Sequence, residues 1–364
     1  MIYCDYQATT PLAPEAREAM LPWLDGPEGT GFGNPHSPHR FGRQAAAAVE
    51  LARDRVAALF PPGGRVIFTG SATEAINLAL RGSHPPGDTR PVAVSAIEHA
   101  AVLDTARALR CPVDILPVDR AGLVDPACIL PDTARVVAVM QVNNEIGTIQ
   151  PVDALARRAK ELGALFLCDA VQGAGKLAPP AEADMIAVSA HKLYGPKGIG
   201  ALWIRDGVTL EPLLTGGGQE QGLRSGTLSP ALCAGFGVAA KLSIKLLESD
   251  AQHVEKLWER ACSLLPGWAL NGSAESRWRG NLNIRREGLD VARLMSDLRT
   301  IAFSAGSACA SGSGRPSHVL SALGVSERQA KSSIRLGFGR YTTLDEIEMM
   351  AESLNAAAER QDMR

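Results

Sequence analysis

Residues 164–198 read ALFLCDAVQGAGKLAPPAEADMIAVSAHKLYGPKG, and this stretch decides the fold class. Its two apolar runs, at 164–168 and 185–188, are typical of buried parallel strands, and each ends abruptly in polar residues. In an open α/β sheet, ligands bind at the carboxyl ends of such strands. Asp169 follows the first run and Lys192 lies just past the second, so an acid and a lysine are expected at one edge of the sheet.

This acid and this lysine have the arrangement that a pyridoxal-phosphate site needs. The acid pairs with the protonated pyridine nitrogen, so that the ring draws electrons, and the lysine amine forms a Schiff base with the aldehyde. An acid and a lysine tens of residues apart are common in soluble proteins. The hypothesis therefore depends on the strands that precede the two residues and on the other strand ends.

Strands and helices alternate between about residue 65 and residue 205, which predicts a mostly parallel seven-stranded sheet covered on both faces. We expect strands at 65–69, 92–96, 113–117, 135–141, 164–168, 185–189 and 200–204, and helices at 14–24, 40–60, 72–81, 99–110, 151–162 and 229–248. After residue 250 the expected order is a helix at 251–265, a strand at 281–285, a helix at 289–299, a strand at 332–338 and a helix at 343–360. The chain thus divides into a large α/β domain, residues 15–250, and a small α+β domain, residues 1–14 and 251–364, with the active site between them.

The composition is that of an ordinary cytosolic enzyme. A hydrophobic content of 46% allows a large core, and a net charge of -2 with a pI of about 6.4 gives no electrostatic argument for nucleic acid or an anionic membrane. The first residues contain an acid and no apolar segment of the kind that signal peptides carry. We therefore expect a cytoplasmic protein with neither a nucleic-acid nor a membrane partner.

Seven cysteines are scattered along the chain without a CxxC pair or a metal-binding spacing, which predicts reduced thiols and no structural metal site. Cys309 differs from the others in its surroundings. Ten of the fourteen residues in 303–316 are Gly, Ser or Ala, a composition that predicts a flexible, exposed loop. A thiol on such a loop can travel to a substrate, although a plain linker that carries a cysteine is the alternative.

Four other strand ends carry residues that suit the cofactor. Ser71 and Thr73 open the helix after the strand at 65–69, where backbone N–H groups could hold a phosphate or the hydroxyls could simply cap the helix. His99 could stack on an aromatic ring or move protons, or it could be structural. Asn144 offers an amide for the phenolic oxygen of the cofactor, and Arg335 can grip a carboxylate.

Motifs along almost the whole chain resemble the cysteine desulfurases of the NifS and IscS type, which are pyridoxal-phosphate enzymes of the class V aminotransferase group with fold type I. The motifs, in family order, are YCDYQATTP, GNPHSPHRFG, SATEAINLAL, EHAAVLDT, VNNEIGT, DAVQGAGK, SAHKLYGPKGIGAL, GGGQEQGLRSGT, SAGSACASG and SSIRLGFGRYTT. So many specific motifs in one order leave no room for coincidence.

The resemblance implies a role for individual residues. Around pyridoxal 5'-phosphate it places Lys192 as the Schiff-base lysine, Asp169 at the pyridine nitrogen, Gln172 and Asn144 at the ring oxygen, His99 over the ring, and Ala72, Thr73, Ser189 and His191 at the phosphate. Arg335 and Asn144 would bind the substrate carboxylate. Thr227 would reach the phosphate of a neighbouring subunit, which implies a homodimer, and Cys309 would be the catalytic cysteine.

The implied reaction converts L-cysteine to L-alanine and leaves the sulfur as a persulfide on Cys309, for delivery to an iron–sulfur scaffold or another acceptor protein. Cys309 could then transiently ligate a cluster together with a scaffold. Three alternatives stay open: a selenocysteine lyase, an aminotransferase that does not need Cys309, and a non-catalytic sulfur-relay or scaffold subunit. The sequence stops soon after its last expected helix, whereas longer relatives continue with a tail that helps dock the scaffold, so the resemblance leaves docking by that route an open question.

Overall fold

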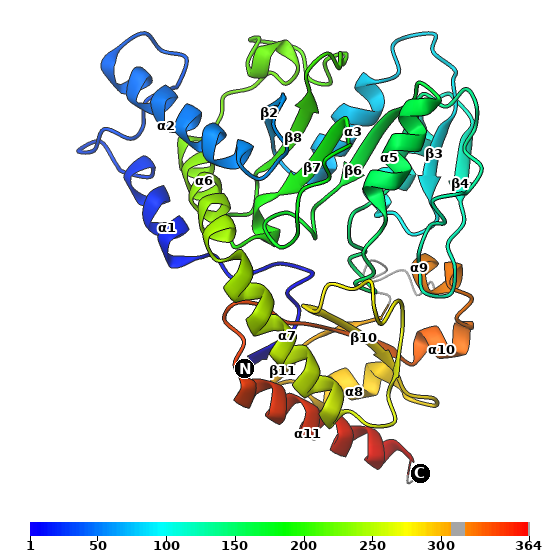
Figure 1. The fold of residues 1–364 in the computed structure, drawn as a ribbon. Helices are drawn as coiled ribbons and strands as arrows, with labels where there is room; N and C mark the ends of the chain where they lie inside the picture. The colour runs from blue at the N-terminus through cyan, green and yellow to red at the C-terminus, as the bar shows by residue number, and fades with distance from the viewer. Residues whose placement is uncertain (307–316, 363–364) are drawn as a thin grey trace.

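Seven strands form one sheet in the larger part of the molecule (Figure 1), a computed structural model that describes residues 1–306 and 317–362. Cys309 lies outside the described residues. The spatial order is β2-β8-β7-β6-β5-β3-β4, and only β8 runs antiparallel to its neighbours. The strands are β2 Gly64–Thr69, β3 Val92–Ser95, β4 Val113–Leu116, β5 Val136–Ala138, β6 Leu165–Asp169, β7 Met185–Ser189 and β8 Gly200–Arg205. The predicted mostly parallel seven-stranded sheet is confirmed.

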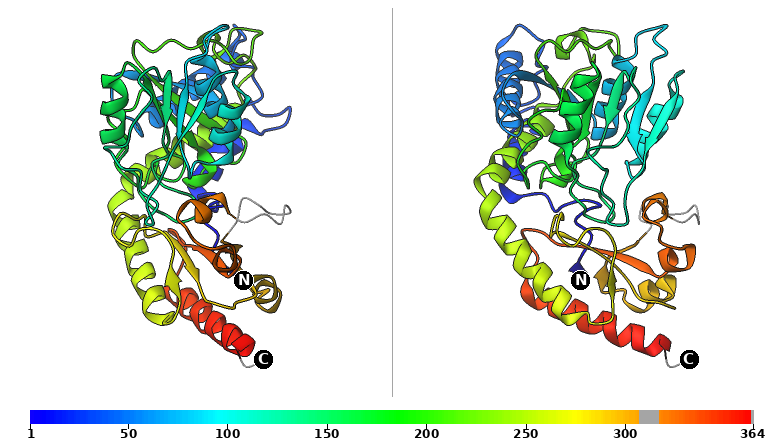
Figure 2. Two further views of the ribbon diagram at one scale, coloured as in Figure 1. Left: turned by 90° about the vertical axis from the view of Figure 1, so that its right-hand side faces the viewer. Right: turned by 45° about the vertical axis from the view of Figure 1, so that its right-hand side comes forward.

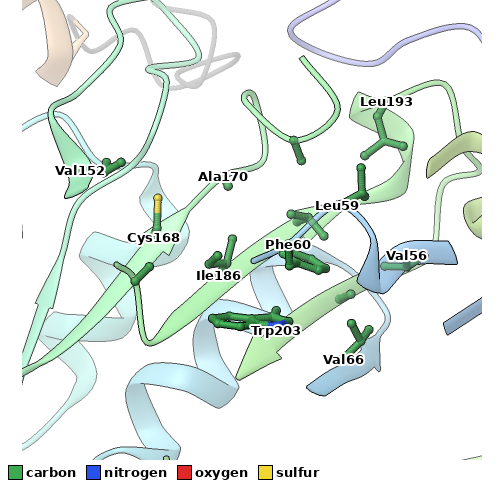
Figure 3. Packing of buried hydrophobic residues seen from close by; sticks show 14 of the residues in the cluster. Val56, Leu59, Phe60, Val66, Val152, Cys168, Ala170, Ile186, Leu193 and Trp203 are labelled. Atoms are coloured by element: carbon green, nitrogen blue, oxygen red, sulfur yellow. The ribbon is translucent and has the colours of Figure 1, made fainter. Parts of the chain in front are cut away.

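Helices cover both faces of this sheet. They are α1 Pro14–Met20, α2 Arg40–Ala57, α3 Ala72–Gly82, α4 Ala100–Ala108, α5 Val152–Glu161 and α6 Pro230–Lys245, with short 3-10 turns η1 Leu21–Trp23, η2 Ala190–Lys192 and η3 Glu220–Gly222. Because successive side chains of a strand point to opposite faces, alternate residues pack in different layers. Val66 and Phe68 belong to a core cluster that includes residues of α2, α5 and α6, whereas Ile67 belongs to a second cluster with residues of α3 and α4. Figure 3 shows part of the first layer, with Trp203 and Phe60 stacked near Ile186.

A smaller unit has its own core below the large sheet (Figure 2). Its antiparallel sheet has the order β12-β13-β10-β9, and the N-terminal strand β1 pairs in parallel with β11, which brings the N-terminus into this unit. The elements are β1 Ile2–Tyr3, α7 Leu247–Leu264, β9 Ala269–Leu270, β10 Asn281–Arg285, α8 Val291–Asp297, β11 Ile301–Ala302, β12 Ser304–Ala305, α9 His318–Ala322, α10 Glu327–Lys331, β13 Ser333–Gly337 and α11 Leu344–Asp362.

The helix expected at 229–248 ends earlier than predicted. It stops at Lys245, and α7 begins at Leu247 after a bend of 73°. The break lies at Leu246, where α6, which packs on α1 and α2, gives way to α7, which packs on α11. Within the described residues no single helix is long and apolar enough to cross a membrane, and only the bent α6–α7 pair taken together meets the length and hydropathy required.

The candidate active site

One cavity of about 310 Å³ lies where strands of the large sheet end, facing the smaller unit. All strands except β8 run in one direction, so their carboxyl ends share an edge. Ten of the residues singled out in the sequence line this cavity: Ala72, Thr73, His99, Asn144, Asp169, Gln172, Ser189, His191, Lys192 and Arg335. They come from six separate stretches of the chain, and the fold alone brings them together.

Lys192 ends the short turn η2 that follows β7. The N-terminal segment holds this turn: the Thr10 hydroxyl donates to the His191 carbonyl (2.9 Å) and accepts from the Tyr194 N–H (2.8 Å). Tyr194 has a φ of 66°, a left-handed conformation that costs a side-chain-bearing residue free energy, and these contacts offset the cost. The Lys192 ammonium donates to the carbonyls of Gln7 and Ala8, the second at 2.7 Å.

Asp169 is the last residue of β6, and its side chain is buried in the cavity wall. One carboxylate oxygen accepts the Val171 N–H at 3.0 Å. Burial raises the pKa of Asp169, while the charges of His99 and Lys192 and the hydrogen bond from Val171 oppose that rise. Across residues 1–306 and 317–362 no direct salt bridge involves Asp169, so its carboxylate can pair directly with a cationic group of a ligand.

Helix α3 points its N-terminus at the cavity. Ser71 caps it by accepting the Glu74 N–H at 3.3 Å, so the capping interpretation of the sequence is also correct. Ala72 and Thr73 are the first helical residues, and their N–H groups have no partner within the helix. The start of β8 passes very close: a Cβ on Gly200 would lie 2.6 Å from the Ser71 carbonyl carbon, so this approach requires glycine.

His191 also lines the cavity, and its imidazole is neutral. Burial, followed by the positive charges of neighbouring lysines, lowers the pKa of His191 to about 4. Its Nδ1 lies 3.1 Å from the Thr9 hydroxyl. A neutral imidazole here can donate one hydrogen bond to an anion, whereas a second positive charge beside Lys192 would be costly.

His99 and Gln172 lie on loops after β3 and β6. The His99 Nδ1 accepts the Ala101 N–H at 3.0 Å as the N-cap of α4, which leaves the proton of the neutral ring on Nε2. The Gln172 amide nitrogen donates to the Gln7 carbonyl at 2.9 Å. The contact with a ring oxygen that the sequence predicts for Gln172 would use this nitrogen, so that contact stays a prediction.

Arg335 reaches the cavity from β13 of the smaller unit, with a side chain only 4% exposed. Its Nη1 donates to the Asn144 carbonyl at 3.0 Å, and its Nη2 donates to the Asp5 carboxylate at 2.8 Å. The Nε is buried and has no hydrogen-bond partner in the described part of the chain. A buried N–H without a partner is costly, and a ligand carboxylate would supply one.

One described site residue that the sequence predicts, Thr227, is not in the cavity wall. Thr227 is exposed on the loop before α6, outside the lining residues. Arg224 of that loop binds Glu74 of α3 at 2.7 Å, so the loop is anchored near the start of the helix that faces the cavity. Cys309 lies outside the described residues, and its role stays a prediction.

Comparison with known proteins places this geometry in a family. Residues 2–350 match the family model described as aminotransferase class V. The cysteine desulfurase IscS of Rickettsia typhi is 42% identical over 95% of this chain and 88% of its own length. The chain belongs to the class V aminotransferases, among the cysteine desulfurases. Its fold superimposes on a NifS-like protein with a TM-score of 0.89 (32% identity, 100% of both chains) and on the NifS-like protein of Rickettsia africae with a TM-score of 0.88 (29% identity, 99% of both chains).

Metal-ligating residues do not cluster in the described part of this desulfurase. Among residues 1–306 and 317–362, no group of three or more His, Cys, Asp or Glu side chains is placed to hold a metal ion. The six cysteines in those ranges are free: Cys4, Cys111, Cys128, Cys168, Cys233 and Cys262. Burial raises the pKa of each of these thiols, which favours their protonated form.

Glu98 was not among the site residues expected from the sequence, yet its side chain is fully buried. One oxygen accepts the Met140 N–H at 2.8 Å and the Ser95 hydroxyl, and the other is buried without a partner in the described part of the chain. Burial, with a contribution from the Asp169 charge, raises the pKa of Glu98 to about 8. At neutral pH Glu98 is therefore protonated in the folded protein. The sequence signal that could have pointed to Glu98 is a carboxyl two residues past the apolar strand expected at 92–96.

Glu98→Gln is expected to remove a pH dependence of stability. An unfolded glutamate loses its proton near 4.5 and the folded one near 8, so within this window the folded protein holds one more proton. The free energy of unfolding therefore falls as pH rises from 4.5 to 8, by at most about 1.4 kcal/mol per pH unit. Glutamine keeps the acceptor oxygen and cannot ionise.

The measurement compares unfolding midpoints of wild type, Glu98→Gln and the exposed control Glu352→Gln across this window at one protein concentration. The unfolding midpoint of Glu98→Gln should rise relative to that of wild type as pH increases. The midpoint of the control should change with pH as the wild-type midpoint does. Parallel curves for Glu98→Gln would show that the carboxyl is ionised in the folded protein.

Proposed function

We propose that this chain is a pyridoxal-phosphate-dependent cysteine desulfurase that converts L-cysteine to L-alanine and passes the sulfur to Cys309. The observation that carries the proposal is the cavity, because it gathers the lysine, the buried acid, the helix N-terminus and the arginine from separate elements. The membership of the chain in the cysteine desulfurases supports the same substrate. The sulfur then goes to an acceptor, for which an iron–sulfur scaffold is the leading candidate.

The residues present fit the cofactor. Asp169 is a buried carboxylate without a direct salt bridge in the described part of the chain, and it could pair with a protonated pyridine nitrogen. The N–H groups of Ala72 and Thr73 at the start of α3, with Ser189 and His191, would hold the phosphate. Once bound to Lys192, pyridoxal phosphate supplies an electron sink for the carbon that loses its proton.

Lys192 has two tasks in this proposal, first to hold the cofactor and then to move the α-proton of the substrate. The carbonyls of Gln7 and Ala8 accept hydrogen bonds from its amine and fix it beside the cavity. The amine works as a base only when it is neutral. In this proposal His99, which lines the same cavity, exchanges protons with the substrate thiol.

Arg335 and Asn144 orient the substrate by its carboxylate. The guanidinium is fixed on three sides by protein oxygens, and its unpartnered Nε offers the next hydrogen bond. A carboxylate bound here places the rest of the amino acid toward Lys192, because both residues line the same cavity. L-Cysteine and L-alanine share this carboxylate, so the arginine serves substrate and product alike.

Sulfur transfer needs a nucleophile, for which the sequence offers Cys309. Its thiolate attacks the sulfur of L-cysteine, an S–S bond forms and the C–S bond breaks with its electron pair left on carbon. Two protons complete L-alanine, and the enzyme keeps a persulfide. Sulfur is oxidised and carbon is reduced within the same step, so no external oxidant is required. An aminotransferase would not need Cys309.

A homodimer would complete the phosphate site. Thr227 is exposed on its own subunit, and Arg224 anchors its loop to Glu74 at the start of α3. We propose that Thr227 crosses to the phosphate of the neighbouring subunit. Size-exclusion chromatography with light scattering tests this: a dimer of wild type that loses cofactor affinity in Thr227→Ala supports it, and a monomer with full cofactor affinity contradicts it.

Product analysis separates the proposed reaction from its alternatives. Cofactor-loaded protein is given L-cysteine, L-selenocysteine, or L-alanine with a 2-oxo acid, each with a thiol reductant. We expect alanine and sulfide in equal amounts from L-cysteine and no amino-group transfer. Alanine from selenocysteine alone would assign a selenocysteine lyase, amino-group transfer would assign an aminotransferase, and a protein that cannot be loaded with cofactor would be a scaffold or relay subunit.

A further inference from the structure

The Arg335 side chain is hydrogen-bonded to two other side chains, those of Asp5 and Ser304. Asp5, near the start of the chain, accepts a hydrogen bond from Arg335 Nη2 at 2.8 Å and another from the Ser304 hydroxyl at 3.0 Å. The same Nη2 lies 3.3 Å from the Ser304 oxygen. Three side chains from β12, β13 and the segment after β1 thus form one closed group at the edge of the cavity.

The backbone holds Asp5 in place. Asp5 forms a parallel bridge with Gly337, and the Gly337 N–H donates to the Cys4 carbonyl at 2.8 Å. The two segments approach so closely that a Cβ on Gly337 would lie 2.7 Å from the Tyr6 nitrogen. Ser304 is likewise fixed, because it pairs with Arg335 across the β12–β13 ladder. Asp5 is therefore a rigid support for the guanidinium.

The hydrogen bonds at Arg335 leave one of its N–H donors, Nε, available to a ligand. Nη1 is held by the Asn144 carbonyl and Nη2 by Asp5 and Ser304, whereas Nε, although buried, has no partner in the described residues. A guanidinium is planar and presents its donors in a fixed fork, so fixing two nitrogens also fixes the direction of the third. Bidentate recognition of a carboxylate depends on that direction.

We propose that Asp5 is a positioning residue for Arg335, and that its carboxylate aims the guanidinium at the carboxylate of the amino-acid substrate. This inference rests on the proposed function, in which Arg335 binds that carboxylate. Asp5 does not touch the substrate. It acts through Arg335. Its removal should therefore weaken the binding of ligands that have a carboxylate and leave the binding of amines without one unchanged.

The test compares two amines that differ only in the carboxylate. L-Alanine and ethylamine are titrated into cofactor-loaded protein, and binding is followed by the absorbance of the bound cofactor. Asp5→Ala should raise the Kd for L-alanine by about tenfold or more, a loss of about 1.4 kcal/mol, and should change the Kd for ethylamine by less than about twofold. Asp5→Asn keeps an oxygen toward Nη2 and should restore most of the affinity for L-alanine.

Asp88→Ala is the matched control. Asp88 also binds two arginines, Arg90 at 2.5 Å and Arg135 at 3.7 Å, but it precedes β3 at the opposite edge of the sheet. It should leave the binding of both amines unchanged. If Asp5→Ala raised the Kd for both amines by the same factor, or bound L-alanine more tightly than wild type, the inference would be overturned while the proposed function stayed intact. A wild-type protein that did not prefer L-alanine to ethylamine would overturn the role of Arg335 itself and the inference with it.

Discussion

Replacing Cys309 by serine should lower sulfide release from L-cysteine by about 10³-fold or more, while the bound cofactor keeps its absorbance. A serine hydroxyl is hardly ionised at neutral pH and attacks sulfur poorly, whereas a cysteine of ordinary pKa is about a few per cent thiolate. Binding of the cofactor does not use the thiol. The measurement pairs a sulfide assay with an absorbance spectrum of the same sample.

Cys128→Ser is the control for this variant. Cys128 lies in a loop of the large unit, is partly exposed, and has a pKa that burial raises. Its replacement should leave sulfide release at the wild-type level. If Cys309→Ser also released sulfide at the wild-type rate, the nucleophile would be elsewhere and the proposed sulfur transfer would be wrong.

Lys192→Ala should abolish the long-wavelength absorbance of covalently held cofactor and reduce alanine formation by about 10³-fold or more. One residue supplies both the covalent bond to the cofactor and the base for the α-proton, so a single substitution removes two functions. Cofactor that binds without this bond should be lost on gel filtration or dialysis. Absorbance before and after dialysis, with an alanine assay, gives the result.

Lys176→Ala tests whether Lys176, a second lysine whose charge interacts with that of Lys192, could hold the cofactor instead. Burial, with the charge of Lys192, lowers the pKa of Lys176 to about 7, so this amine is also chemically competent. It does not line the cavity, and its nearest aromatic partner is the ring of Trp278, 5.9 Å away. Lys176→Ala should retain the absorbance. Loss of the absorbance in Lys176→Ala and its retention in Lys192→Ala would reverse the assignment.

The central sheet could be predicted from the sequence because each buried strand is an apolar run that ends in polar residues. Expected strands at 185–189 and 200–204 match β7 and β8 closely, since burial on both faces leaves an uninterrupted apolar signal. The antiparallel direction of β8 was not visible in its sequence. The two-residue strands β1 and β11 were also not predicted, because so short a segment carries no periodicity.

The cavity lining could largely be predicted because strand ends and family motifs point to the same residues. What escaped prediction depends on pairings across the chain. Asp5 and Arg335 are 330 positions apart, and no local pattern connects them. Glu98 directly precedes His99 in the sequence, and its neutral carboxyl follows from its complete burial in the folded protein. Lys192 binds the backbone carbonyls of Gln7 and Ala8, and because every residue has such a carbonyl, the sequence cannot predict these contacts.

The central claim, that Lys192 makes the sulfur of L-cysteine transferable and Cys309 receives it, is tested most directly in a single turnover. Cofactor-loaded protein in excess is mixed with L-cysteine without reductant, alanine is quantified, and the Cys309 peptide is weighed by mass spectrometry. We predict one alanine for each Cys309 peptide that gains one sulfur atom. Alanine without that added sulfur, or added sulfur confined to another cysteine, would contradict the account.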